Sequence, residues 1–230
     1  TCGEVTGAVL VFQDITRLRE AEQLKEDFLS LVSHEFRTPL TTIHGGAHLL
    51  VNQGEELDAQ TRRELLHDIV EESDRLHRML ANMLVLTEVM SGRLEARLEP
   101  LPVEQLVRAA ATSAAARTGI HTFHVEFAPG LPPAQGDAAL LAQVLRNLYQ
   151  NAVKYSPGGG KILTTVSCDD RMLSIAISDA GIGISGADLE RVFDRFYRAG
   201  ADPSVHGSGL GLYLSRNLVE VQGGRISASS

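Results

Sequence analysis

Residues 28–40 read FLSLVSHEFRTPL, and this stretch decides how the first half of the chain is interpreted. Its apolar residues have helical spacing, so His34 and Thr38, four positions apart, share one face of the helix. Glu35 lies beside the imidazole and can keep one ring nitrogen protonated, which leaves the other nitrogen as a nucleophile. The pattern therefore predicts a helix that carries His34 as a phosphate acceptor.

Pro39 is expected to shape this helix. It has no N–H, and its ring collides with the carbonyl of Glu35 four residues back, so we expect a bend next to His34. A His-Glu pair alone is more common on a solvated surface, but the whole block resembles the H box of sensor histidine kinases. In similar kinases the His-Glu-x-x-Thr pattern, completed here by Thr38, orients a water that dephosphorylates a response regulator. A hydrogen bond from the Thr38 hydroxyl to the backbone is the alternative role.

The composition sets wider bounds. The chain has 230 residues, 43% of them hydrophobic, which is enough for one or two modest cores. No apolar run approaches the roughly 20 residues of a membrane span, so we expect this portion to be cytoplasmic and without membrane contact. The net charge of −8 argues against nucleic acid as a partner. Cys2 and Cys168 lie far apart, which indicates a reducing compartment. Because the chain begins at Thr1, we expect a fragment of a longer protein.

Residues 1–15 carry a short β-like run, AVLVF at residues 8–12, followed by Asp14-Ile15-Thr16. This pattern resembles the last strand and the exit motif of a PAS sensor domain, which implies an upstream sensor domain. A strand-to-helix junction of another kind would have a similar sequence. A single strand cannot bury its own faces, so this piece is expected to be poorly held without the rest of its domain.

Residues 16–99 have a helical pattern that breaks at Asn52-Gln53-Gly54 and restarts at Asp58, an N-cap candidate. With the H-box resemblance, the two helices are expected to form a dimerisation and histidine phosphotransfer hairpin. One hairpin buries too little apolar surface, so a second copy would complete a four-helix bundle, which predicts a homodimer. A structural coiled coil is the alternative, but it leaves the block around His34 unexplained. The predicted seam repeats every seven positions, with two more residues interleaved: Ile69, Leu76, Met83 and Met90, then Leu66 and Leu80.

Residues 100–230 alternate between helical and strand patterns after an expected hinge at Pro100-Leu101-Pro102. Such a mixture predicts an α/β sandwich, a mixed sheet covered on one face by helices. A further strand is expected after Gly223-Gly224, and the chain stops inside it at Ser230, so this domain is expected to be C-terminally truncated. The expected helices span residues 103–117, 137–155 and 210–221, and the expected strands span residues 121–127, 162–168 and 173–179.

The second of these helices carries Asn147, Asn151, Lys154 and Tyr155 on one face. Amide oxygens suit Mg²⁺, which prefers oxygen ligands, and an ammonium group suits phosphate. The pattern is therefore a candidate site for a magnesium-bound phosphate group. A polar helix surface is the alternative when the pattern is taken alone.

Two glycine-rich segments follow. In Asp179-Ala180-Gly181-Ile182-Gly183, a buried carboxylate at a strand end can accept a hydrogen bond from an adenine amino group, and Gly181 and Gly183 allow close backbone approach. In Gly207-Ser208-Gly209-Leu210-Gly211, the glycines open a helix whose free N–H groups and positive dipole end suit phosphates. Either segment alone is a weak signal.

In this order and spacing the three segments resemble the N, G1 and G2 boxes of the GHKL ATP-binding fold. Residues 193–198 resemble the F box, with residues 199–206 as a short ATP lid, and Arg198 is either a phosphate ligand or a solvated arginine. The resemblance to histidine kinases covers residues 16–229 and implies ATP and Mg²⁺ as cofactors. The implied ligands are Asn151 for magnesium with Asn147 assisting, Lys154 for phosphate, Asp179 for adenine, and Tyr155 packed beside the nucleotide.

Asn147 separates two activities within this superfamily. Members that hydrolyse ATP carry a glutamate there, which activates water, whereas an amide cannot act as a general base. The resemblance thus implies a kinase that phosphorylates His34 and passes the phosphoryl group to an aspartate of a response regulator receiver domain. The rival functions are a non-enzymatic phosphotransfer module and an ATP-hydrolysing machine. His44 and His48 have the spacing of a metal pair but no third ligand nearby, which favours a surface position or packing in the bundle.

Overall fold

The computed structural model describes residues 14–169, 172–199 and 209–230, and in the first helix it leaves out the side chains of residues 16–18, 20–29, 31 and 34. The PAS-like run and Gly207 therefore lie outside the described residues. The chain divides into two compact units, residues 1–76 and 77–230, and each is described by itself.

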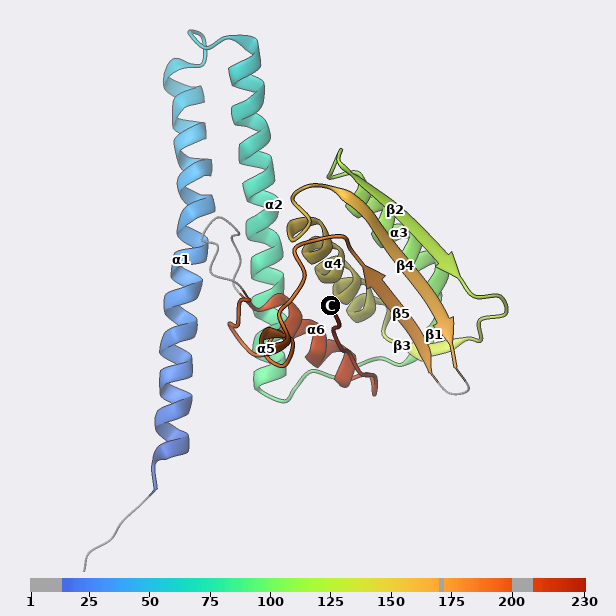
Figure 1. The fold of residues 1–230 in the computed structure, drawn as a ribbon. Helices are drawn as coiled ribbons and strands as arrows, with labels where there is room; N and C mark the ends of the chain where they lie inside the picture. The colour runs from blue at the N-terminus through green and yellow to red at the C-terminus, as the bar shows by residue number, and fades with distance from the viewer. Residues whose placement is uncertain (1–13, 170–171, 200–208) are drawn as a thin grey trace, which may run out of the picture. The chain divides into compact units, whose positions relative to one another are not determined.

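Two long helices make up the hairpin, α1 (Thr16–Gln53) and α2 (Ala59–Met90) (Figure 1). Pro39 lies inside α1, which continues through it. Asp58 caps α2 as predicted, because its Oδ1 accepts the N–H groups of Gln60 and Thr61, both at 2.9 Å. The Thr61 hydroxyl also donates to Asp58, and these bonds lower the pKa of the carboxyl below its ordinary 3.8.

α1 presents two neighbouring rows of residues with alternating spacings of three and four. One row is covered: Pro39 and Gly46 are buried, and a Cβ added at Gly46 would lie 3.2 Å from Ile69 of α2. The other row is open, with Leu40 exposed at 52% and Val51 at 83%. A single hairpin therefore leaves an uncovered apolar face on α1.

The seam predicted on α2 is partly covered within the single chain. Ile69, Leu76 and Met83 are half-buried in the single chain, so they are already partly covered. A heptad pattern with apolar residues at several positions contains adjacent rows, and the sequence does not show which row a neighbouring helix covers. The apolar residues of α2 that remain exposed are Leu66 at 51%, Val70 at 60%, Leu80 at 51% and Leu84 at 60%, which form the exposed row beside it, and Met90 of the predicted seam at 51%.

The second unit is built on a three-stranded mixed sheet, as predicted. Strands β2 (His121–Phe127), β4 (Gly160–Cys168) and β5 (Leu173–Ser178) lie in the order β2-β4-β5. β2 runs parallel to β4, and β4 runs antiparallel to β5. Burial alternates along all three strands, so one face of the sheet is covered and the other is polar.

Helices α3 (Val103–Ala115) and α4 (Ala138–Lys154) cover this face, and α6 (Gly211–Glu220) packs on α4 (Figure 1). The main core lies between α3, α4 and the sheet, where the Tyr149 hydroxyl meets Thr164 Oγ1 at 2.7 Å. A second core forms around Val144, Leu214 and Leu218, with Val85 and Val89 from the end of α2 packed against it. The two sides of α4 are therefore both occupied, and its polar residues lie between the two cores.

The segment expected to be a hinge is a strand instead. β1 (Glu99–Leu101) pairs antiparallel with β3 (Ala134–Gly136), which ties the entry of this unit to the start of α4. Asp137 caps α4 and also accepts the Arg97 N–H at 3.1 Å. Burial opposes ionisation of this carboxyl, but the N–H bonds outweigh it and lower its pKa. Strands of three residues carry no readable periodicity, which explains why both were missed.

Two further differences concern the last third of the chain. A short helix, α5 (Gly186–Leu189), was not predicted; it begins at Ser185, whose hydroxyl accepts the Asp188 N–H. The strand expected after Gly223-Gly224 is not formed: residues 224–230 have neither helix nor strand structure. At its end the Ser230 hydroxyl accepts the Ile184 N–H at 2.8 Å.

Candidate active site

The predicted phosphoacceptor turn lies in α1. The backbone of His34 is helical, whereas its side chain is outside the described part of the structure. Glu35 is half-buried, and its Oε2 lies 3.7 Å from Nη2 of Arg75 on α2. Arg75 also contacts Glu72, at 3.4 Å. The carboxylate next to His34 is thus held by an arginine of α2 in the same chain. The two residues are 40 positions apart, and no sequence pattern indicated this contact.

Thr38 is exposed on the same helix. Among the described residues its hydroxyl donates to no backbone carbonyl, which is the alternative role considered for it. The two threonines that follow do make such bonds: Thr41 Oγ1 donates to the carbonyl of Arg37 at 2.8 Å, and Thr42 Oγ1 to that of Thr38 at 3.4 Å. The Thr38 hydroxyl therefore remains accessible from solvent.

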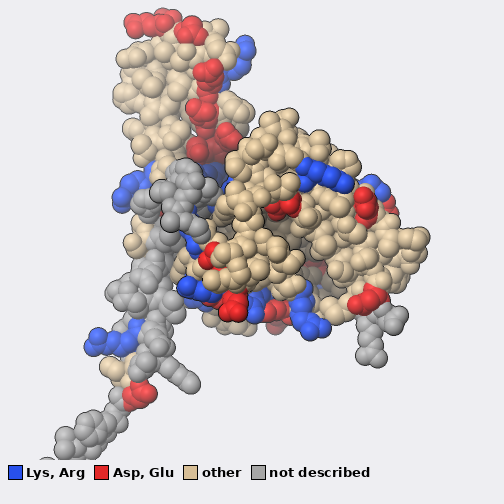
Figure 2. Space-filling model, viewed as in Figure 1, with Lys and Arg blue, Asp and Glu red and all other residues tan. Residues whose placement is uncertain are grey.

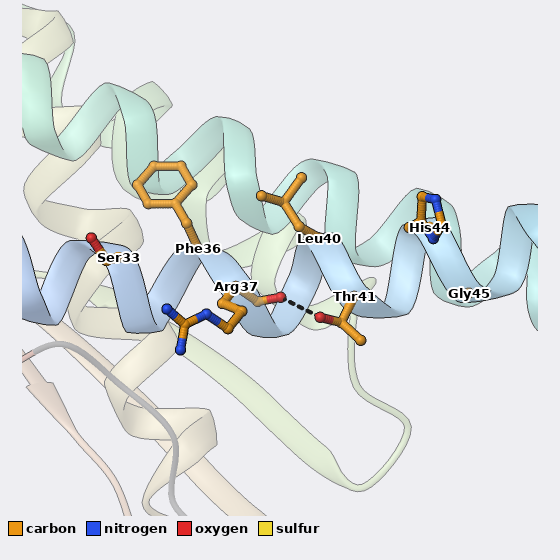
Figure 3. Close-up of a pocket in the computed structure, with 7 residues that line it drawn as sticks. All are labelled: Ser33, Phe36, Arg37, Leu40, Thr41, His44 and Gly45. Carbon is orange, nitrogen blue, oxygen red and sulfur yellow. Dashed lines mark hydrogen bonds between the residues drawn. The ribbon is translucent and has the colours of Figure 1, made fainter.

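A shallow groove runs along α1 from this turn, and Figure 3 shows its lining. Phe36, Leu40 and His44 stand on one side of the helix in that view, with the guanidinium of Arg37 on the other. The groove thus joins an apolar strip to a basic group directly after His34 in the chain. Acidic side chains gather elsewhere on the hairpin, toward the α1–α2 connection (Figure 2).

In the second unit, Asn147 joins the first predicted segment to the third. It is 8% exposed, and its Nδ2 donates to the Gly211 carbonyl and to Ser215 Oγ, both at 3.4 Å. Asn151 lies one turn later on the same helix and is half-buried. Because the amide nitrogen of Asn147 is directed at α6, its oxygen points the other way and remains a possible ligand.

Lys154 and Tyr155 lie side by side at the end of α4. Lys154 Nζ donates to the Tyr155 hydroxyl at 3.2 Å and lies 4.7 Å from the centre of its ring. Both residues are half-buried. The ammonium group is thus placed beside an aromatic ring, close in sequence to Asn151.

The second predicted segment follows β5 and packs on the end of α4. Asp179 Oδ1 accepts the Gly181 N–H at 2.9 Å and the Ser156 hydroxyl at 3.3 Å, and Ile182 N donates to the Tyr155 carbonyl at 3.0 Å. A Cβ at Gly181 would lie 2.3 Å from that same carbonyl. Glycine is required here by the chain's own backbone. Asp179 is bonded to Ser156 and is exposed, not buried as the sequence predicted, because it lies beyond the end of β5.

The third segment is described from Gly209 onward. Gly209 has a φ of +67°, and a Cβ there would lie 2.6 Å from the backbone of Phe196. Leu210 is buried and precedes Gly211, the first residue of α6. The N-terminus of α6 is therefore packed against residues 196–197 and against Asn147 of α4.

Three residues of the predicted F box, Phe193, Arg195 and Tyr197, make packing or hydrogen-bond contacts within this unit. Phe193 is buried, and Arg195 donates to the Tyr213 hydroxyl of α6 at 2.7 Å. The Tyr197 hydroxyl donates to Asp188 of α5, and this bond lowers the pKa of Asp188 and raises that of Tyr197. Arg198 is exposed immediately before the predicted lid, of which residues 200–206 lie outside the described residues.

The donors available for a cation are amides rather than carboxylates. Within residues 14–169, 172–199 and 209–230, no group of three His, Cys, Asp or Glu side chains could hold a metal. The oxygens of Asn147 and Asn151 fit a hard ion that keeps water and phosphate as its other ligands. His44 and His48 are both exposed, and Nδ1 of His48 lies 2.8 Å from Nδ2 of Asn52, which fits the surface position expected as one alternative. No helix in the described ranges is long and apolar enough to cross a membrane.

Comparison with protein families gives two matches. Residues 24–92 match the His Kinase A (phospho-acceptor) domain, and residues 136–230 match the histidine kinase-, DNA gyrase B- and HSP90-like ATPase family. Drug sensory protein A of Synechocystis is 35% identical over 228 residues, which cover 93% of this chain and 34% of that protein. Sensor histidine kinase WalK of Bacillus subtilis is 32% identical over 236 residues, covering 99% of this chain and 38% of WalK. The chain spans about a third of the length of these relatives.

Solved structures show the same fold. Histidine kinase ThkA in complex with response regulator protein TrrA matches with a TM-score of 0.62 at 22% identity, over 94% of this chain and 61% of that one. Full-length ShkA in complex with AMPPNP matches with a TM-score of 0.57 at 29% identity, over 86% of this chain and 41% of the ShkA chain. The helical hairpin, the mixed sheet and both family matches agree, and the chain therefore belongs to the sensor histidine kinase family, of which it holds a phospho-acceptor domain and an ATP-binding domain.

Proposed function

We propose that this chain transfers the γ-phosphoryl group of ATP to His34. One observation carries the proposal: the position where ATP-hydrolysing relatives of this fold carry a water-activating glutamate holds Asn147, a buried amide bonded to α6. An amide does not activate water, so the phosphoryl group is preserved for transfer. Expected positions for the ligand are Asp179 for adenine, Lys154 for phosphate, and Asn151 with Asn147 for Mg²⁺, with Tyr155 beside the nucleotide.

The chemical step requires little covalent participation from the protein. The free imidazole nitrogen of His34 forms a bond to the γ-phosphorus while the bond to the β–γ bridging oxygen breaks, and ADP leaves. The proton displaced from the ring passes to Glu35. Arg75 supports this role, because an arginine on one carboxylate oxygen leaves the other for the imidazole. A bound Mg²⁺ would neutralise charge on the phosphates.

We further propose that phosphorylated His34 donates to an aspartate on the receiver domain of a response regulator. The groove beside His34 supports this, since it offers an apolar strip and Arg37 to a partner. The exposed hydroxyl of Thr38 is suited to hold a water for the reverse reaction, removal of phosphate from that regulator. Histidine kinase ThkA, which has the same fold, forms a complex with the response regulator protein TrrA.

The hairpin is proposed to act as a homodimer. The exposed apolar row on α2 and the open row on α1 need a partner, and a second copy supplies both at once. The assigned boundaries are residues 1–15 for the end of a PAS-like sensor domain, 16–99 for the hairpin and 100–230 for the ATP-binding domain. The upstream sensor domain is then expected to act through α1.

The test is incubation of the chain with γ-labelled ATP and Mg²⁺. A phosphohistidine is labile in acid and stable in base, so label with that stability supports the kinase. Rapid release of phosphate without histidine label would instead support an ATP-hydrolysing machine. A chain that binds no nucleotide would support the non-enzymatic phosphotransfer module.

A further inference from the structure

We propose that Ser156 and His121 are positioning residues that fix Asp179 for recognition of the adenine amino group. This inference rests on the proposed function, because it assigns adenine to Asp179. The residues involved come from three segments: the start of β2, the turn after α4 and the end of β5. The sequence pointed to Asp179 alone, and neither Ser156 nor His121 carried a signal for this role.

The orientation of the Asp179 carboxylate is the first step. Both of its hydrogen bonds to described residues reach the same oxygen: Oδ1 accepts the Ser156 hydroxyl at 3.3 Å and the Gly181 N–H at 2.9 Å. Two donors on one oxygen fix the rotation of the group and leave Oδ2 directed away from them. Asp179 is exposed, so Oδ2 is accessible to an amino group of a ligand.

Ser156 is fixed in turn. It is 2% exposed, which makes it one of the few buried polar side chains among the described residues. Its carbonyl accepts Nε2–H of His121 at 2.9 Å, and Nδ1 of the same ring lies 2.6 Å from the Thr118 hydroxyl. A carbonyl can only accept, so the proton of the neutral ring is on Nε2 and the Thr118 hydroxyl donates to Nδ1.

The backbone around this chain of bonds is closely packed. Gly160 N donates to the Ile120 carbonyl at 3.2 Å, and Gly159 N donates to the Ser156 carbonyl at 2.9 Å. Gly159 has a φ of +75°, and a Cβ there would lie 2.3 Å from the Ile120 carbonyl. The turn that carries Ser156 is therefore held against the start of β2 by two hydrogen bonds, one from His121 to the Ser156 carbonyl and one from Gly160 N to the Ile120 carbonyl.

A positioned carboxylate makes a specific prediction about the ligand. ATP presents a 6-amino group to Asp179, whereas purine riboside triphosphate lacks that group and is otherwise the same size. If Ser156 orients Oδ2, removing its hydroxyl should weaken ATP binding and leave binding of the analogue nearly unchanged. A residue with a purely structural role would weaken both nucleotides equally.

The experiment measures the Kd of the Mg²⁺ complexes of both nucleotides by titration calorimetry. For the unaltered chain we expect the analogue to bind about tenfold more weakly than ATP. Ser156→Ala should raise the Kd of ATP about fivefold and that of the analogue less than twofold, so that the preference for ATP falls to about two- to fourfold. Ser156→Thr retains a hydroxyl and should retain the preference.

The second arm tests His121. His121→Leu removes the donor to the Ser156 carbonyl and should reduce the preference for ATP in the same direction, whereas His121→Gln, which keeps an N–H donor, should retain most of it. Ser174→Ala, an exposed serine of β5, is the matched control and should bind both nucleotides unchanged.

An equal loss of affinity for both nucleotides in Ser156→Ala would overturn the proposal, and so would an unchanged preference. Circular dichroism of each variant identifies a failure to fold, in which case Ser156→Thr and His121→Gln decide the outcome. The phosphohistidine assay on the same preparations separates the two ideas. If the chain selects ATP through Ser156 but no histidine is labelled, the role of Ser156 is supported and the kinase activity is refuted. If the chain binds no ATP, both proposals are refuted.

Discussion

Arg75 of α2 forms an ion pair with Glu35 of α1, with 3.7 Å between Nη2 and Oε2. The pair joins the two helices of the hairpin at the residue next to His34. An ion pair of two half-buried groups contributes about 1 kcal/mol or less to stability, so its position matters more than its strength. It fixes the carboxylate that we assign to orient the imidazole.

Arg75→Gln should slow autophosphorylation about fivefold, because Glu35 loses one of the contacts that fix its carboxylate. ATP affinity should not change, since no residue assigned to the nucleotide lies in the hairpin. Single-turnover labelling at saturating MgATP measures the rate, and Arg75→Lys is the control that keeps the charge. An unchanged rate in Arg75→Gln would show that the ion pair with Arg75 is not required for the role of Glu35 in autophosphorylation.

His34→Gln should abolish the acid-labile label while ATP affinity stays within about threefold of the unaltered chain. The change removes the proposed nucleophile and nothing assigned to the nucleotide. His44→Gln, on an exposed position of the same helix, is the matched control and should label normally. Label on any residue of the His34→Gln variant would refute the assignment.

Leu66→Glu with Val70→Glu should convert the proposed dimer to monomers that keep their helical content. These side chains are exposed in the single chain, at 51% and 60%, so charge there opposes only an intermolecular contact. Ile69→Glu with Leu76→Glu is the contrasting variant and should unfold the hairpin, because both residues are half-buried within one chain. Sedimentation and circular dichroism read the two effects separately, and an unaltered chain that is monomeric at micromolar concentration contradicts the bundle.

Asn151→Asp should cut autophosphorylation about tenfold or more, because a charged ligand disturbs the magnesium geometry next to the phosphates. The measurement is histidine labelling at several Mg²⁺ concentrations. Asn151→Gln keeps the amide at a greater length and separates the effect of charge from that of reach. Normal labelling in Asn151→Asp would exclude this residue as the main magnesium ligand.

Asn147→Glu should raise the ratio of released phosphate to phosphohistidine, since it introduces a possible general base. It should also lower the Tm, because the buried amide donor to the Gly211 carbonyl and Ser215 is replaced by a carboxylate. Both quantities must be measured at saturating MgATP, with Asn147→Gln as the amide control. A ratio that stays constant would mean that the amide is not what suppresses hydrolysis.

The cap of α2 gives a prediction about pH. The pKa of Asp58 is lowered in the folded chain, mainly by the Thr61 hydroxyl, so its stabilising effect is present above its ordinary 3.8 and is lost as the pH falls through the lowered value. Asp58→Ala should therefore have a lower Tm than the unaltered chain at pH 7, and the difference should shrink below about pH 4. Asp58→Asn, a good cap without charge, should keep the Tm without this dependence. A difference that stays the same in acid would exclude the carboxylate as its source.

Local patterns were sufficient to predict the longer elements of the ATP-binding unit. The strand at residues 121–127 agrees with β2, and the helices expected at 103–117 and 137–155 agree with α3 and α4 to within two residues. Alternation and helical periodicity are properties of a segment and its own side chains, so they can be read without knowing the neighbours. The same holds for the Asp58 cap, which bonds to residues two and three positions away.

What the sequence alone determined is therefore the list of chemical groups: His34 with Glu35, the amides of α4, Asp179 and the glycines. The tertiary structure decided which of them meet. It paired Glu35 with Arg75, turned the Asn147 amide to α6, placed Ser156 and His121 behind Asp179, and covered Ile69 while leaving Val70 open. Each of these contacts joins different elements, and a contact between distant residues depends on the packing of the whole unit rather than on the periodicity of any one segment.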